Sequence, residues 1–82
     1  MFINRAGDGR NNLCGRNVAA FRTVLGISQR ELADRLQLQG LEIDKNAIQR
    51  IEAGKRFVTD IELLALSAVL EKSCEELLKP LE

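Results

Sequence analysis

Apolar residues recur along most of this chain at spacings of three and four positions, the repeat that places side chains on one face of an α-helix. The first such stretch stops at Gly26, a residue type favoured just after a helix. Its apolar positions are Cys14, Val18, Phe21 and Leu25. Residues 1–12 lack the repeat and are rich in Gly, Asn and Arg, which predicts a flexible N-terminal arm.

Four further helix starts are indicated by polar N-cap residues. Three of them have a capping box, in which a Ser or Thr N-cap is followed three positions later by Glu. The pairs are Ser28 with Glu31, Thr59 with Glu62, and Ser73 with Glu76. The fourth start is at Asp44, where Ile43 and Ile48 have the spacing of a hydrophobic staple.

The same pattern predicts where these helices end. The second helix extends towards Gly40, and the third covers about residues 44–53, before Gly54. The fourth has a broad apolar face, and the fifth is short and stops at Pro80. The apolar residues of these two helices are Leu63, Ala65, Leu66, Val69, Leu70, Leu77 and Leu78. No stretch has a convincing strand pattern, so the fold class expected is all-α with five helices.

Length and composition agree with one small folded domain, which we place at residues 13–80. The chain has 82 residues, and 45% of them are hydrophobic, which is typical of a globular protein. It has only three aromatic residues, so Leu, Ile, Val and Ala must form most of the core. The second and third predicted helices are short and capped, and a segment containing Gly40 joins them.

Charge is divided unevenly along the chain, although the formal net charge is zero. Residues 1–58 contain ten Lys or Arg and six Asp or Glu, whereas residues 59–82 contain two and six. Such asymmetry is typical of a protein with a nucleic-acid face and an acidic far side. The alternative is an ordinary solvated surface with chance clustering.

Several functional classes have no support in the residues. The chain lacks His, and Cys14 and Cys74 are far apart with no metal-ligand spacing, so we expect reduced cysteines and no metal or cofactor. No catalytic arrangement is present, and we expect no enzyme activity. No apolar run approaches the ~20 residues of a membrane span, and no signal sequence precedes the domain, which favours a cytoplasmic protein.

The third predicted helix has the side chains that recognise DNA bases. Arg and Lys donate to guanine edges, and Asn and Gln pair with adenine in the major groove. Four such residues project away from the apolar stripe and form the candidate base contacts: Lys45, Asn46, Gln49 and Arg50. The alternative for each is a solvated helix face.

Candidate phosphate contacts flank this helix. Gln29 is at the start of the second helix, where backbone N–H groups and the helix dipole attract anions. Lys55 and Arg56 follow the third helix, where they also compensate the dipole. Arg5, Arg10 and Arg16, on or near the arm, are further candidates. Such contacts would position the protein without reading base sequence.

The runs GISQRELADRL, IQRIEAGKR and TDIELLALSAVL, in this order, resemble the Cro/XRE-type family of lambda-repressor-like helix-turn-helix domains. The resemblance covers roughly residues 12–78 and implies the five-helix fold of that family. It also implies a phosphate contact at Gln29 and base contacts on the outer face of the third helix. In the family, the Glu at the position of Glu52 often pairs with a basic residue of the second helix, for which Arg35 or Arg30 is the candidate here.

The sequence departs from the family pattern between the second and third helices. Fifteen positions separate Ala33 from Ile48, more than in the compact pattern, and Gln37 occupies the usual place of the turn Gly. We therefore expect a second helix with an extra turn and a longer connection, which would change the tilt of the third helix.

Together these features predict a sequence-specific transcriptional regulator. The hypothesis is a repressor that binds a short palindromic operator on double-stranded DNA, as a homodimer. Apolar residues left exposed on the last two helices would form the dimer contact. The alternative is a protein-interaction module of the same fold, such as an antitoxin or an adaptor with a protein partner.

Overall fold

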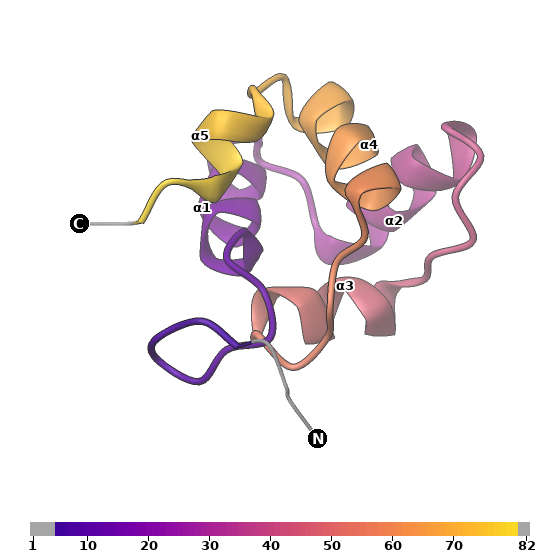
Figure 1. Cartoon of the computed structure of the whole chain (residues 1–82). Helices are drawn as coiled ribbons and strands as arrows, with labels where there is room; N and C mark the ends of the chain where they lie inside the picture. Colours follow the sequence, from indigo (N-terminus) through magenta and orange to yellow (C-terminus); the bar gives the residue numbers. More distant parts are fainter. Residues whose placement is uncertain (1–4, 81–82) are drawn as a thin grey trace.

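The computed structural model describes residues 5–80, which form five α-helices joined by short connections and contain no strand (Figure 1). The predicted all-α, five-helix fold is confirmed. The helices are α1 (Gly15–Leu25), α2 (Gln29–Leu38), α3 (Lys45–Glu52), α4 (Asp60–Leu70) and α5 (Cys74–Leu78).

The helix starts follow the predicted capping residues, with one difference. Thr59 and Ser73 form complete capping boxes, and Asp44 accepts a hydrogen bond from the N–H of Ala47. At Ser28 only half of the box forms: its hydroxyl accepts the N–H of Glu31, but the Glu31 carboxylate does not return to Ser28. That carboxylate instead pairs with Arg35 one turn later, a charged partner that competes with the capping geometry. The complete box predicted at Ser28 was therefore wrong.

The helix ends lie near the predicted glycines. Gly26 caps α1 in the left-handed region, at φ 73°. α2 reaches Leu38 and its C-cap is Gln39, so the predicted cap Gly40, at φ 91°, lies one residue beyond the observed cap. The six residues Gln39–Asp44 connect α2 to α3, and the extra turn of α2 relative to the family pattern stays a prediction.

The core lies where the inner faces of the helices meet. The staple residues Ile27, Ile43 and Ile48 are buried, while Val58 and Leu63 pack at the edge of the core. The broad apolar face predicted for α4 is present: Leu66 and Leu70 are fully buried, and Leu63, Ala65 and Val69 are partly buried against the core. The largest fully buried side chains are Val18, Leu32, Leu36, Ile48, Ile51, Leu66, Leu70 and Leu77.

The arrangement of the helices leaves one face of α3 free. α2 and α3 pack against each other, and α1 contacts α3, α4 and α5. In Figure 1, α3 lies across the lower edge of the molecule, with the other helices above it. Its inner face is covered and its outer face is open to a partner.

The described part of the N-terminal segment folds back on the domain. Ala6 and Arg10 are joined by a backbone hydrogen bond of 2.8 Å, and the N–H of Asn11 donates to the carbonyl of Gly54. Residues 10–12 are thereby attached to the end of α3, which the expectation of a flexible arm did not include. Composition suggested flexibility, but these polar side chains find backbone carbonyls that only the fold brings near. Residues 1–4 of the predicted arm lie outside the described residues.

Both cysteines are free thiols, as the sequence predicted. Cys14 is buried at the start of α1, and burial raises the pKa of its thiol. Within residues 5–80, no helix has the length and hydropathy needed to cross a membrane.

Candidate nucleic-acid interface

The outer face of α3 brings together the four predicted base-contact residues. Ile48 and Ile51 anchor the inner face in the core, so the positions between them point outward. Within residues 5–80 the outward side chains have no intramolecular hydrogen bond or ion pair, which leaves their polar groups for an external partner. All four are exposed: Lys45, Asn46, Gln49 and Arg50.

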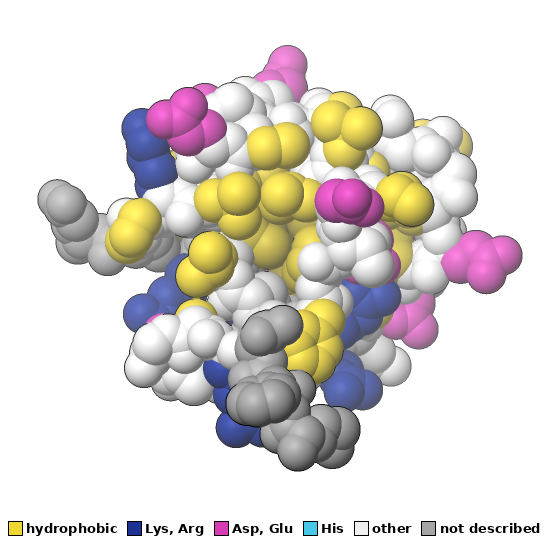
Figure 2. Space-filling model, viewed as in Figure 1, with side chains coloured by type: hydrophobic (Ala, Val, Ile, Leu, Met, Phe, Trp, Pro, Cys, Tyr) yellow, Lys and Arg dark blue, Asp and Glu magenta, His cyan; other side chains and the backbone are white. Residues whose placement is uncertain are grey.

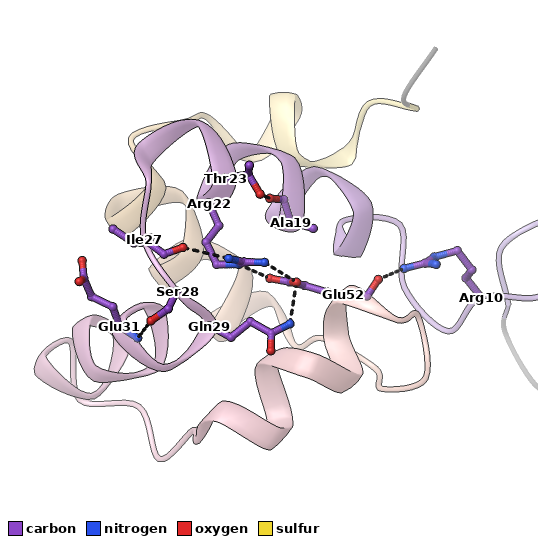
Figure 3. Close-up of polar contacts among 9 residues, drawn as sticks. All are labelled: Arg10, Ala19, Arg22, Thr23, Ile27, Ser28, Gln29, Glu31 and Glu52. Atoms are coloured by element: carbon purple, nitrogen blue, oxygen red, sulfur yellow. Dashed lines mark hydrogen bonds and ion pairs between the residues drawn. The ribbon is translucent and has the colours of Figure 1, made fainter.

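A polar cluster behind α3 fixes its C-terminal end (Figure 3). Glu52 accepts hydrogen bonds from Arg22 Nε at 2.7 Å and Arg22 Nη2 at 3.0 Å. The amide of Gln29 donates to the same carboxylate at 2.9 Å. Arg22 Nη1 donates to the carbonyl of Ile27. The Glu52 carboxylate therefore joins α1 through an ion pair, and the start of α2 through a hydrogen bond, to the end of α3.

The partner of Glu52 differs from the one expected. The resemblance implied Arg35 or Arg30 of the second helix, but Arg35 pairs with Glu31, and Arg30 is exposed. Arg22 reaches Glu52 because α1 packs directly against α3. The expected pairing with the second helix was therefore wrong.

Burial makes this ion pair structurally important. The side chain of Arg22 is 17% exposed and that of Glu52 is 9% exposed. Hydrogen bonding to the carboxylate raises the pKa of the Arg22 guanidinium, so it stays charged. The sequence did contain a signal for Arg22, which follows Val18 by four positions and therefore lies near the apolar face of its helix. A charged residue there needs a buried partner.

Gln29, a predicted phosphate contact, is half-buried and already bonded to Glu52. An amide nitrogen has two hydrogens, so this bond leaves one of them for another acceptor. The bond to Glu52 holds the Gln29 side chain at the N-terminus of α2. This position combines a side-chain donor with the free backbone N–H groups of the first helical turn.

The other two predicted phosphate contacts, Lys55 and Arg56, differ in exposure and in whether their charge is already paired. Lys55 is exposed directly after α3. Arg56 is partly buried and donates to both carboxylate oxygens of Glu62, at 2.9 and 2.8 Å, and to the carbonyl of Phe57. These contacts lower the pKa of Glu62. A phosphate would compete with Glu62 for the guanidinium of Arg56, whereas Lys55 has no such competitor among the described residues.

Two of the arm arginines also have partners. Arg10 Nη2 donates to the carbonyl of Glu52 at 2.7 Å, and Arg16 lies 3.5 Å from Asp8 in an exposed ion pair. Figure 2 shows that Lys and Arg side chains lie mostly in the lower half of the view, where α3 lies. Asp and Glu lie mostly above and to the right of them. The charge asymmetry of the sequence is thus also an asymmetry of this face.

These features agree with comparisons with known proteins. A helix-turn-helix family model matches residues 18–77, most of the chain. The chain belongs to the Cro/XRE-type helix-turn-helix family. Family membership makes this helix-turn-helix protein a DNA-binding transcription regulator.

The fold is similar to that of a solved structure of the same family. This is the restriction-modification controller protein C.AhdI from Aeromonas hydrophila, with a TM-score of 0.67 and 28% sequence identity. The match covers 77% of this chain and 84% of that one. The predicted lambda-repressor-like architecture is thereby confirmed. Among curated proteins, no sequence matches significantly.

Proposed function

We propose that this helix-turn-helix protein is a sequence-specific, non-catalytic repressor that recognises a short palindromic operator through α3. The observation that carries this proposal is the outer face of α3, where Lys45, Asn46, Gln49 and Arg50 are exposed and unpaired within residues 5–80. These side chains match the donor and acceptor patterns of guanine and adenine edges. A repressor would act by occupying the promoter, in the cytoplasm, where its DNA lies.

Phosphate contacts at either side of α3 support this orientation on DNA. Gln29 at the start of α2 and Lys55 after α3 are the two candidates best placed to contact phosphate oxygens. Arg56 is a third candidate, whose pairing with Glu62 would have to loosen on binding. The basic part of the surface in Figure 2 gives the attraction to the DNA backbone.

Exposed apolar side chains support the proposal of a homodimer. Ile61 and Leu64 are 69% and 67% exposed on one face of α4, and Leu13 and Leu78 are exposed on neighbouring elements. Figure 2 shows hydrophobic side chains gathered in the middle of this view, over α4 and α5. A two-fold axis through this apolar surface would present two copies of α3 to two half-sites.

The operator is tested first, by incubating the protein with a randomised duplex pool at about physiological salt and sequencing the retained DNA. We expect an enriched, roughly palindromic motif. Gln49→Ala and Arg50→Ala are each expected to weaken binding to that motif by about 1–3 kcal/mol without loss of the fold. Lys79→Ala, which removes one positive charge after α5, is the control and should change affinity little.

A flat pool would contradict the proposal and favour the second candidate, a protein-interaction module such as an antitoxin or adaptor. The exposed apolar face of α4 is the observation that favours it. Salt separates the two: binding to DNA weakens steeply with salt concentration, whereas binding through an apolar face does not.

The dimer is tested by sedimentation of the free protein. Leu64→Asp is expected to produce monomers, because it places a charge in the apolar surface. Leu38→Asp, at an exposed Leu on α2, is the matched control. A wild-type protein that stays monomeric at high concentration, or a Leu64→Asp variant that stays dimeric, would contradict this dimer.

A further inference from the structure

The end of α3 is held by a segment that precedes the family match. Asn12 uses both hydrogens of its amide nitrogen, donating to the carbonyls of Ile51 at 3.1 Å and Arg56 at 2.7 Å. Its amide oxygen accepts the N–H of Gly15 at 2.8 Å. One side chain therefore joins the start of α1 to the last turn of α3 and to the loop that follows it.

Arg10 and Asn11 complete the contact. Arg10 Nη2 donates to the carbonyl of Glu52 at 2.7 Å (Figure 3). Asn11 donates through its backbone N–H to the carbonyl of Gly54 at 2.8 Å and through its amide to the carbonyl of Lys55 at 3.2 Å. The last carbonyls of a helix have no partner within the helix, and a cation there is favourable for the helix dipole. The three residues thus supply what the end of α3 lacks.

The N-terminal segment and the start of α1 pack closely against the end of α3. A Cβ added to Gly15 would collide with the carbonyl oxygen of Ile51. A Cβ added to Gly54, which has φ 77°, would collide with the guanidinium of Arg10. The backbone of α1 and the side chain of Arg10 therefore fit directly against the end of α3.

The other end of α3 is held more simply. It follows the six-residue connection Gln39–Asp44. Asp44 caps the helix, and Gln37 donates to the carbonyl of Ile43 at 2.9 Å. α3 has only eight residues, and a helix so short depends on tertiary contacts for its stability and orientation. The hydrogen bonds that reach α3 from distant parts of the chain are therefore concentrated at its C-terminal end.

We propose that Arg10, Asn11 and Asn12 form a clamp that positions α3 and thereby determines the sequence specificity of DNA binding. These are positioning residues: they act on bases only through α3, and Gln49 and Arg50 are the base-contact candidates nearest the clamped end. This inference rests on the proposed function, because it takes α3 as the helix that recognises bases.

The test uses Arg10→Lys, which keeps the charge and loses the planar donors, and Asn12→Ala, which removes the amide. Binding is measured to the selected duplex and to a scrambled duplex, over a range of salt concentrations. Both variants are expected to lower the ratio of the two affinities by about tenfold, the loss of roughly one good base contact. Affinity for the scrambled duplex and the salt dependence are expected to stay unchanged.

The controls remove the same chemistry elsewhere. Arg16→Lys alters an exposed arginine near the same segment, and Gln39→Ala removes an amide from the α2–α3 connection. Neither should change the ratio. If folded Arg10→Lys and Asn12→Ala keep the wild-type ratio, the clamp does not set specificity. If the affinities for both duplexes fall together, these residues contribute to general DNA affinity and the proposal is overturned. Arg10→Lys decides alone if Asn12→Ala does not fold.

A separate measurement distinguishes failure of the clamp from failure of the proposed function. If the wild-type protein does not discriminate between duplexes, the proposed function fails, and backbone amide exchange of the free protein decides about the clamp. Faster exchange at the amides of residues 53–55 in both variants, with α5 unchanged, would support it. Unchanged exchange there would overturn it.

Discussion

The two ends of α3 are held in different ways. At its start, the carboxylate of Asp44 accepts a hydrogen bond from the N–H of Ala47, only three positions away. At its end, Arg22, Gln29 and the segment Arg10–Asn12 contact it from elsewhere in the chain. Hydrogen bonding at the start is therefore local, and hydrogen bonding at the end is tertiary, although core packing holds both ends. A helix of only eight residues depends on such tertiary contacts for its stability and orientation.

The largest effect on stability should come from removing the ion pair between Arg22 and Glu52 at the C-terminal end of α3. Arg22→Ala leaves the Glu52 carboxylate mostly buried and without its cation, so we expect the free energy of unfolding to fall by about 3 kcal/mol. Chemical denaturation measures it. Arg35→Ala breaks an exposed pair one turn apart and should cost less than about 0.5 kcal/mol. If Arg22→Ala and Arg35→Ala lowered the free energy of unfolding equally, burial of the Arg22–Glu52 pair would not contribute to its effect.

The next effect should come from the close approach of α1 to α3. Gly15→Ala introduces a methyl group against the carbonyl of Ile51, and we expect a loss of about 2 kcal/mol in the free energy of unfolding. Gly7→Ala is the matched control, since no heavy atom lies within 4 Å of a Cβ added there. A Gly15→Ala protein as stable as wild type would mean that the two helices separate without cost.

A smaller effect on stability is expected at the N-terminal end of α3. Asp44→Ala removes the side-chain acceptor for the N–H of Ala47, and loss of such a cap costs about 1 kcal/mol. Asp44→Asn keeps an acceptor and should retain most of the stability measured by denaturation. If Asp44→Ala destabilised the protein more than Arg22→Ala, the two ends of α3 would have to be ranked in the opposite order.

The smallest effect concerns pH at the loop after α3. Hydrogen bonding to Arg56 lowers the pKa of Glu62 from the ordinary 4.5, so the unfolded chain binds the proton more readily than the folded one. The stability contributed by this pair is present above pH 4.5 and is lost as the pH falls through the lower folded pKa.

Glu62→Gln should therefore weaken the loss of stability on acidification below pH 4.5, by less than about 1 kcal/mol, as thermal unfolding at several pH values would measure. Glu42→Gln, at an exposed position in the α2–α3 connection, is the control. If the wild type and Glu62→Gln lost stability equally as the pH falls below 4.5, the pair of Glu62 with Arg56 would make no contribution to the pH dependence of stability.

The candidate interface was predictable wherever it depended on one helix. The repeat that buries Ile48 and Ile51 also places Lys45, Asn46, Gln49 and Arg50 outside, so the sequence alone located the outer face of α3. It did not locate the supporting contacts. Whether these four side chains contact DNA bases stays a prediction.

The phosphate candidates show why position along the chain does not reveal which basic side chains are free to contact DNA. Lys55 and Arg56 are adjacent in the sequence, yet one is exposed and the other is paired with Glu62. The pairing depends on how the loop after α3 meets the start of α4. Similarly, the basic partner of Glu52 came from α1, because the packing of helices decides which distant side chains meet.

The sequence by itself determined the number of helices, their capped starts and their buried faces, since these depend on residues three or four positions apart. Only the tertiary structure decided the partner of Glu52, the attachment of Arg10–Asn12 to the end of α3, and the exposure of Ile61 and Leu64. The bonds to the end of α3 join groups 23 to 44 positions apart, and their energies depend on burial and close approach. No local pattern encodes those distances.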